Sequence, residues 1–87
     1  MTTAAPAEIV RERTRDYLTA SLCRPVADEE DIFASGMANS LFSVQLVAFV
    51  ENEFGIAVED DELDPANFRS TDAITAFVAG KLTGRTG

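Results

Sequence analysis

The fold is decided by the stretch SLFSVQLVAFVENEF, which runs from Ser40 to Phe54 and is followed by Gly55. Nine of its fifteen residues are apolar, and at about 100° per residue they spread over more than one face of a helix. Asn39 before it is a favoured N-cap, and glycine is favoured just beyond a helix end. The stretch therefore predicts a helix that is apolar most of the way round, which must be surrounded or must contact a partner.

Helical spacing sorts the apolar residues of this stretch into three stripes. The first would join a bundle core and contains Leu46, Val47, Val50 and Phe54. The second, which we call the docking stripe, lies nearly opposite and contains Leu41, Val44 and Ala48. The third pairs Phe42 with Phe49. Because a small bundle rarely surrounds one helix completely, we expect the docking stripe to be exposed. The alternative is that the preceding loop folds over one stripe, and the two phenylalanines are the more readily covered.

Upstream of this helix, the sequence predicts another helix and a long loop. Helical spacing predicts a helix over 7–22, with a core stripe of Val10, Tyr17, Leu18 and Leu22. Pro25 disfavours helical backbone in the residue before it, so the helix ends near Arg24. Residues 25–39 then show no sustained period. Loops of this length are usually functional or anchored, and Ile32 and Phe33 are the expected anchors.

Downstream, two more helices are predicted. Asp64 followed by Pro65 is typical of an N-cap and first helical position, and begins a short helix that ends near Phe68. Ser70 or Thr71 caps the last helix, whose core stripe contains Ile74, Phe77, Val78 and Leu82. The expected fold is all-α: a single domain over residues 1–87, built as a small four-helix bundle. It has a long loop between the first and second helices, a short third helix, and frayed ends at 1–6 and 84–87.

Charge is distributed unevenly along the chain. The formal net charge is −8, and residues 25–68 contain eleven Asp and Glu but no Lys or Arg. Such a segment repels nucleic acid and anionic lipid and attracts partners with basic docking surfaces. A solvated surface that keeps the protein in solution is the plainer explanation. No stretch approaches the roughly 18 apolar residues of a membrane span, and no apolar run opens the chain, so we expect a cytoplasmic monomer.

Few residue types that support catalysis are present. The chain has no histidine and one cysteine, Cys23, so a base for a nucleophilic serine and the ligands of a zinc site are both missing. Cys23 is expected to be a small buried hydrophobe near a helix end. The acidic run from Glu59 to Asp64 could attract Ca²⁺ but lacks the ligand spacing of an EF-hand loop. We therefore expect a protein that is not an enzyme and has no metal site.

Ser40 is the remaining candidate for a functional residue. It lies at the start of the apolar helix, where backbone N–H groups and the helix dipole would favour a covalently attached phosphate. Taken by itself, this position is explained as well by a structural role at the helix start.

Several segments around Ser40 resemble the acyl carrier proteins. They are DIFASG at 31–36, Asn39-Ser40-Leu41, VQLV at 44–47 and ENEFGI at 51–56, and the similarity extends through 64–68 into the last helix. The resemblance implies that Ser40, flanked by Asn39 and Leu41, receives 4′-phosphopantetheine from coenzyme A through a separate phosphopantetheinyl transferase. The thiol of this arm would carry an acyl group as a thioester, while partner enzymes do the chemistry.

The resemblance also implies a docking surface on the same helix. Carried over by position, its apolar residues are those of the docking stripe, Glu51 is a charged member, and Phe42 and Gln45 lie beside them. Besides the transferase, the implied partners are acyl-loading and acyl-modifying enzymes and the acyltransferase or ketosynthase of a synthase.

Departures from the family pattern narrow the kind of carrier. The residue before the serine is usually Asp in the family and is Asn39 here, and positions that are often acidic or small and polar hold Phe42, Gln45 and Asn52. The chain looks most like discrete carriers of polyketide pathways that hold glyceryl-derived, hydroxymalonyl or methoxymalonyl extender units. An aminoacyl, D-alanyl or peptidyl carrier is the alternative within the family. An unmodified helical interaction module is the alternative outside it.

Overall fold

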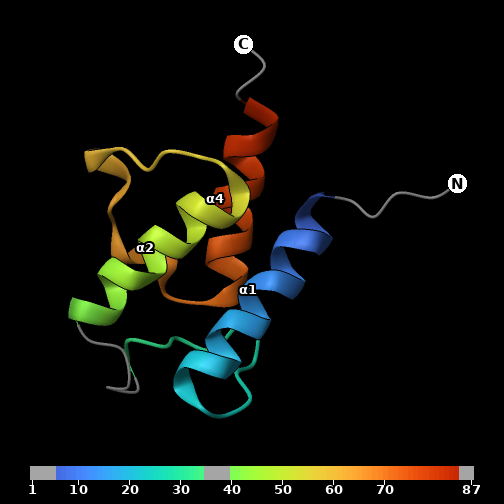
Figure 1. Cartoon of the computed structure of the whole chain (residues 1–87), viewed down its shortest axis with the longest axis vertical. Coiled ribbons are helices and arrows are strands. Elements are labelled where there is room, and N and C mark those ends of the chain that lie inside the picture. The colour runs from blue at the N-terminus through green and yellow to red at the C-terminus, as the bar shows by residue number, and fades with distance from the viewer. Residues whose placement is uncertain (1–5, 35–39, 85–87) are drawn as a thin grey trace, which may run out of the picture.

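The structure, a computed structural model, describes residues 6–34 and 40–84. Its elements, drawn in Figure 1, are α1 (Pro6–Leu22), α2 (Ser40–Phe54), the 3₁₀ turn η1 (Asp60–Glu62), α3 (Pro65–Phe68) and α4 (Thr71–Gly84). No strand occurs within the two described ranges. The predicted all-α class is confirmed, including the long connection before α2 and the short third helix. The 3₁₀ turn was not predicted.

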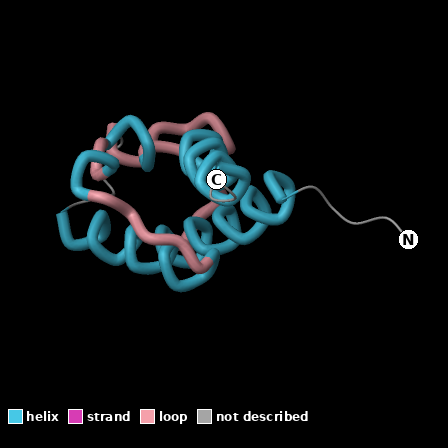
Figure 2. Tube along the Cα trace, turned by 90° about the horizontal axis from the view of Figure 1, so that it is seen from above, coloured by secondary structure: helices cyan, strands magenta, loops and turns pink. Residues whose placement is uncertain are grey.

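The helices pack around a shared apolar core. α1 and α4 contact each other and run in opposite directions (Figure 1), and the view from above shows the helices around a common interior (Figure 2). Buried apolar side chains come from all four α-helices and from the long loop; those with no exposed surface are Leu18, Ile32, Leu46, Val50, Ile74 and Val78. The predicted stripes are largely confirmed, although Tyr17, Val47, Phe54, Phe77 and Leu82 are only partly buried.

The stripe of two phenylalanines on α2 is covered by α1. The ring of Tyr17 stacks on Phe49 with a centroid separation of 4.0 Å and lies 6.3 Å from the ring of Phe42. Phe42 is 8% exposed and belongs to the core. Helical spacing left open whether the long loop would cover this stripe, and the structure places an aromatic side chain of α1 there.

Local capping at the end of α2 and at the starts of α3 and α4 is as the sequence predicted, whereas the predicted N-cap of α2, Asn39, lies outside the described residues. Gly55 follows α2 with a φ of 65°, a left-handed conformation that glycine adopts without steric cost. Its N–H donates to the carbonyl oxygen of Glu51 over 3.0 Å. The side chain of Asp64 caps α3 by accepting from the N–H of Ala66 at 2.9 Å. Ser70, and not Thr71, caps α4, because its Oγ accepts from the N–H of Ala73 at 3.0 Å.

One expectation about the chain's surface, a buried Cys23, is wrong. Cys23 is exposed, because the chain leaves α1 there with a φ of 59° and turns its side chain out of the core. Of the ends expected to fray, Pro6 is the first residue of α1 and Gly84 the last residue of α4. The rest of the predicted frayed ends, 1–5 and 85–87, lies outside the described residues.

The first part of the long loop is held to both α1 and α4. Asp28 accepts two hydrogen bonds from the guanidinium of Arg15, each of 2.9 Å, and lies 3.4 Å from the guanidinium of Arg11. The carbonyl oxygen of Asp28 accepts from the N–H of Asp72 at 2.9 Å, and the N–H of Ile32 donates to Arg69 at 2.7 Å. Ile32 is a core anchor as predicted, and Phe33 is half-buried.

The acidic segment is not left without countercharge. Arginines of α1 and of the following turn pair with Asp28, Glu30 and Glu53, and Lys81 of α4 pairs with Glu62. Tertiary structure therefore brings the basic ends of the sequence against its acidic middle.

Substitution of two glycines by alanine should change the free energy of unfolding in opposite directions. Gly55→Ala places a Cβ on a residue with positive φ, so we expect it to lower the free energy of unfolding by about 1–2 kcal/mol. Gly80 lies within α4 and a Cβ there would meet no atom within 4 Å, so Gly80→Ala should raise the free energy of unfolding by about 1 kcal/mol. Urea unfolding followed by circular dichroism measures both changes. Equal effects of the two substitutions would contradict this assignment of the α2 terminus.

Protonation of Asp28 at low pH should weaken the attachment of the long loop to α1. Hydrogen bonds from Arg15 lower the pKa of Asp28, so its carboxylate stabilises the fold above the unperturbed Asp pKa of about 4, and the stabilisation is lost as pH falls through the lowered pKa. We expect Asp28→Asn to lower the melting temperature at pH 7 and to flatten its fall below about pH 4. The control is Glu29→Gln, at an exposed neighbour. A wild-type acid profile in Asp28→Asn would contradict the prediction.

Candidate functional site

Ser40 is the first residue of α2. Its backbone is described, whereas its side chain and the whole of Asn39 lie outside the described residues. The first four N–H groups of an α-helix have no partner within the helix, and the helix dipole makes this end electropositive. The first turn of α2 contains no acidic residue, so no carboxylate of that turn would oppose an anionic group attached at this end.

The docking stripe is exposed, as its spacing predicted. Leu41 is 66% exposed and Val44 67%, and Ala48 and Gln45 are exposed beside them. Phe42 does not lie on this surface, contrary to the expectation drawn from the resemblance. Its ring is buried against α1 because it lies on the face of α2 that meets Tyr17.

Glu51 has a structural contact that the sequence did not predict. Its Oε2 accepts a hydrogen bond of 2.9 Å from the N–H of Val58, and the side chain is half-buried. This contact fastens the segment that follows α2 back onto the helix. The carboxylate that the resemblance assigned to docking is therefore partly engaged in holding the connection to η1.

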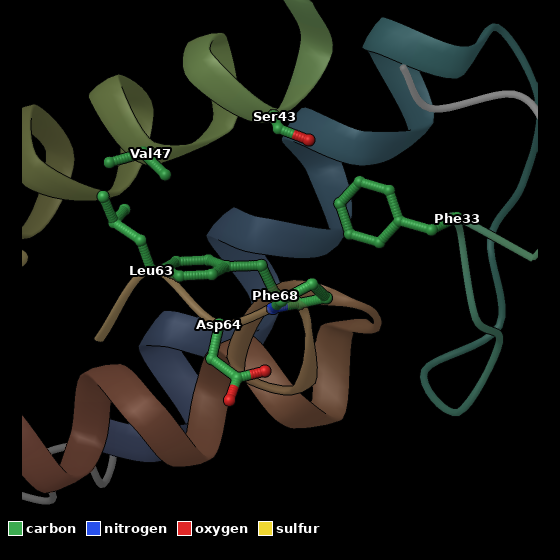
Figure 3. Close-up of a pocket in the computed structure, with 7 residues that line it drawn as sticks. Phe33, Ser43, Val47, Leu63, Asp64 and Phe68 are labelled. Atoms are coloured by element: carbon green, nitrogen blue, oxygen red, sulfur yellow. The ribbon is translucent and has the colours of Figure 1, made fainter. Parts of the chain in front are cut away.

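An apolar cavity opens beside the docking stripe. It has a volume of about 370 Å³ and is lined by Phe33, Ser43, Val47, Leu63, Asp64, Pro65 and Phe68. Figure 3 shows Val47 and Leu63 on one side of this space, Phe33 of the long loop on the other, and Phe68 between them. Ser43 lies one helical turn after Ser40, so the cavity begins close to the start of α2.

A second, shallower hollow of about 460 Å³ continues the cavity along α2. It is lined by Ser43, Val44, Val47, Ala48, Glu51 and Leu63. The two hollows are neighbours that share Ser43, Val47 and Leu63 in their lining, and together we call them the α2–α3 groove. The groove unites the exposed stripe of α2 with residues that follow η1.

Leu63 is the residue of this groove that sequence reasoning missed. It is 51% exposed and lines both hollows. In the sequence, Leu63 is a single leucine within an acidic connection, and a single apolar residue gives no periodic pattern that could predict its position. Glu62, directly before it, pairs with Lys81 of α4 at 2.8 Å, and Leu63 itself lines a hollow together with residues of α2. The same ion pair lowers the pKa of Glu62.

Metal ligands do not gather in the described part of the chain. Within 6–34 and 40–84, no group of three or more His, Cys, Asp or Glu side chains is placed to hold a metal ion. The acidic run from Glu59 to Asp64, considered above for Ca²⁺, is included in that range. Across the same residues, no helix has the length and apolarity needed to cross a membrane.

No protein-family model matches this sequence, and no curated protein is significantly similar to it. The geometry of the site therefore has to support any function assigned to it.

Removal of the Glu51 carboxylate should loosen the connection to η1. Glu51→Ala leaves the half-buried N–H of Val58 without its acceptor, so we expect a loss of about 1–2 kcal/mol in the free energy of unfolding and faster amide exchange at Val58. Asn52→Ala, at the exposed neighbouring position, is the control. Amide exchange measured by NMR checks the result, and unchanged exchange at Val58 would contradict the role given to Glu51.

Proposed function

We propose that this protein is an acyl carrier protein whose Ser40 bears 4′-phosphopantetheine. The observation that carries the proposal is the position of Ser40, at the N-terminus of a helix whose outer stripe is apolar and exposed. A phosphodiester at that position is favoured by the helix dipole and the N-terminal N–H groups. The apolar stripe beside it gives partner enzymes a surface to dock on. The family resemblance of residues 31–56 supports the same assignment.

The attachment step needs no base from this chain. The hydroxyl oxygen of Ser40 would attack the β-phosphorus of coenzyme A, forming a P–O bond as the bond to the bridging oxygen of the pyrophosphate breaks. Adenosine 3′,5′-bisphosphate leaves, and the transferase accepts the hydroxyl proton. The new phosphodiester keeps one negative charge, and the free thiol at the end of the arm then accepts acyl groups as thioesters. The chain itself supplies the nucleophile and the surface.

The α2–α3 groove supports a carrier role by giving the arm an apolar surface beside its attachment point. The cavity of about 370 Å³ within it is lined mostly by apolar side chains and begins one turn from Ser40. An arm attached at Ser40 would leave the chain beside that surface. The groove is apolar on its α2 side because Val44, Val47 and Ala48 lie there.

The kind of carrier follows from the departures on α2. Gln45 and Asn52, both exposed, replace residues that are often acidic or polar in the family, so the docking helix offers less negative charge. We propose a discrete carrier of a polyketide pathway that holds an extender unit. Its partners would be loading and modifying enzymes and then an acyltransferase or ketosynthase.

An unmodified interaction module is the second candidate. The observation that favours it is the exposure of Leu41 and Val44, which would serve a binding partner whether or not Ser40 is modified. The two functions differ in what Ser40 must do. The carrier requires its hydroxyl, whereas the interaction module requires only the apolar stripe.

Incubation with coenzyme A and a broad-specificity phosphopantetheinyl transferase tests the proposal. We expect the intact mass to rise by one phosphopantetheine group in the wild type and not in Ser40→Ala. Ser43→Ala is the matched control, because Ser43 lies one turn further along α2 and lines the groove; it should still be modified. If a control carrier is modified under the same conditions and this chain is not, the carrier function is wrong and the interaction module stands.

A further inference from the structure

The connection between α2 and α3 adds no fully buried side chain to the core. From Gly55 to Asn67, all of which the structure describes, every residue is exposed or half-buried. Ile56 and Val58 are half-buried against the core. A segment with so little buried apolar surface opens more readily than the helices it joins, unless polar contacts hold it. The position of this connection therefore depends on its hydrogen bonds and ion pairs.

The middle of the connection carries most of its charge. We call residues 59–63 the η1 strap, because they contain η1 and end at Leu63 of the α2–α3 groove. Four of the five residues are acidic, and carboxylates so close together repel one another. Leu63 is 51% exposed, so its apolar contacts alone anchor the strap weakly. A positive charge from elsewhere in the fold is needed to hold the strap in place.

Lys81 of α4 supplies that charge. Its Nζ lies 2.8 Å from Oε1 of Glu62, and the two side chains are only 25% and 27% exposed. Among the described residues, the strap makes no other ion pair. Lys81 lies in the last turn of α4, where the helix dipole favours a positive charge. One charged contact thus ties the strap to α4.

Hydrogen bonds carry the position of Glu62 on to the groove. The N–H of Glu59 donates to the same Oε1 at 2.9 Å, and the side-chain amide of Asn67 donates to the carbonyl oxygen of Glu62 at 2.9 Å. Leu63 follows directly, and its N–H donates to the carbonyl oxygen of Asp60 at 3.3 Å. Because Leu63 lines both hollows, the ion pair fixes the residue directly before a wall of the groove.

Lys81 is also connected to a second residue of the groove. Its Nζ lies 6.0 Å from the centroid of the Phe77 ring, and the centroids of the Phe77 and Phe68 rings are 5.3 Å apart. Phe68 and Leu63 both line the cavity of about 370 Å³ (Figure 3). Lys81 is therefore linked to Leu63 through Glu62 and to Phe68 through Phe77.

We propose that the ion pair between Lys81 and Glu62 is a latch that holds the η1 strap closed and thereby sets the shape of the α2–α3 groove. With the pair intact, Leu63 completes the groove beside α2. With the pair broken, the strap detaches while the helices stay folded. This device goes beyond the proposed function and operates whether or not Ser40 is modified.

The latch can be reached from outside the groove. Lys81 lines a hollow of about 430 Å³ that shares no lining residue with the groove. The other residues of this hollow are Gly55, Ile56, Ala57 and Glu59. A charged group bound there that pairs with Lys81 or Glu62 would open the groove without entering it, which is a coupling between two sites.

Amide exchange measured by NMR in rising urea tests whether the strap opens by itself. Local opening exposes little surface, so exchange at Leu63 should depend only weakly on urea. Exchange at Leu46, in the core of the fold, should rise steeply because it requires unfolding of the whole chain. An equally steep rise at Leu63 would mean that the strap opens only with the whole fold, and the latch would be wrong.

Lys81→Gln removes the charge of the latch and keeps a polar side chain. We expect exchange at Leu63 to become about 3- to 5-fold faster, as for the loss of one partly exposed ion pair. The methyl signals of Val47, which lines both hollows together with Leu63, should shift. Lys81→Arg keeps the positive charge and should retain the wild-type exchange rate at Leu63.

Arg13→Gln is the matched control, because it removes one cation from an ion pair with Glu53 whose residues do not line the groove. It should leave both the exchange at Leu63 and the Val47 signals unchanged. The proposal is overturned by unchanged exchange in Lys81→Gln, by unmoved Val47 signals, or by an equal effect of Arg13→Gln. Since these measurements involve neither coenzyme A nor Ser40, such a result would leave the carrier function standing.

Discussion

The structure depends on one constraint: α2 is apolar on more sides than this small core can cover. Leu46 and Val50 fill the centre, and Tyr17 of α1 covers the two phenylalanines. The docking stripe stays in solvent, although burial of each large apolar side chain would contribute about 1.5–3 kcal/mol. Folding alone does not explain why these side chains are leucine and valine. A binding partner that covers the stripe would recover part of this free energy.

Ion pairs hold the segments before and after α2 to the other helices. Acidic residues of the middle segment pair with arginines of α1 and the lysine of α4, so that the long loop is tied to α1 and η1 to α4. Asp28 and Glu62 are the main fixing points.

A carrier function requires no catalytic groups from the chain itself, and the sequence contains no histidine and one cysteine. It needs a hydroxyl at an electropositive helix end, an exposed docking surface and a fold that stays fixed while partners come and go. The proposed roles of Ser40 and of the α2–α3 groove are compatible, because Ser40 begins α2 and Ser43, one turn later, lines the groove. The acid–base chemistry would belong to the partner enzymes.

The sequence by itself determined the helices and their ends, because caps, prolines, glycines and helical spacing act over a few residues. It also indicated that Leu41, Val44 and Ala48 would be exposed, since they lie opposite the core stripe. Tertiary structure decided the fates of Phe42, Glu51 and Leu63. The ring of Phe42 is buried against Tyr17 of α1. The carboxylate of Glu51 accepts a hydrogen bond from a backbone N–H beyond the end of α2. Leu63 follows Glu62, which the ion pair with Lys81 holds to α4. No local pattern records such contacts, because they depend on which distant segments meet.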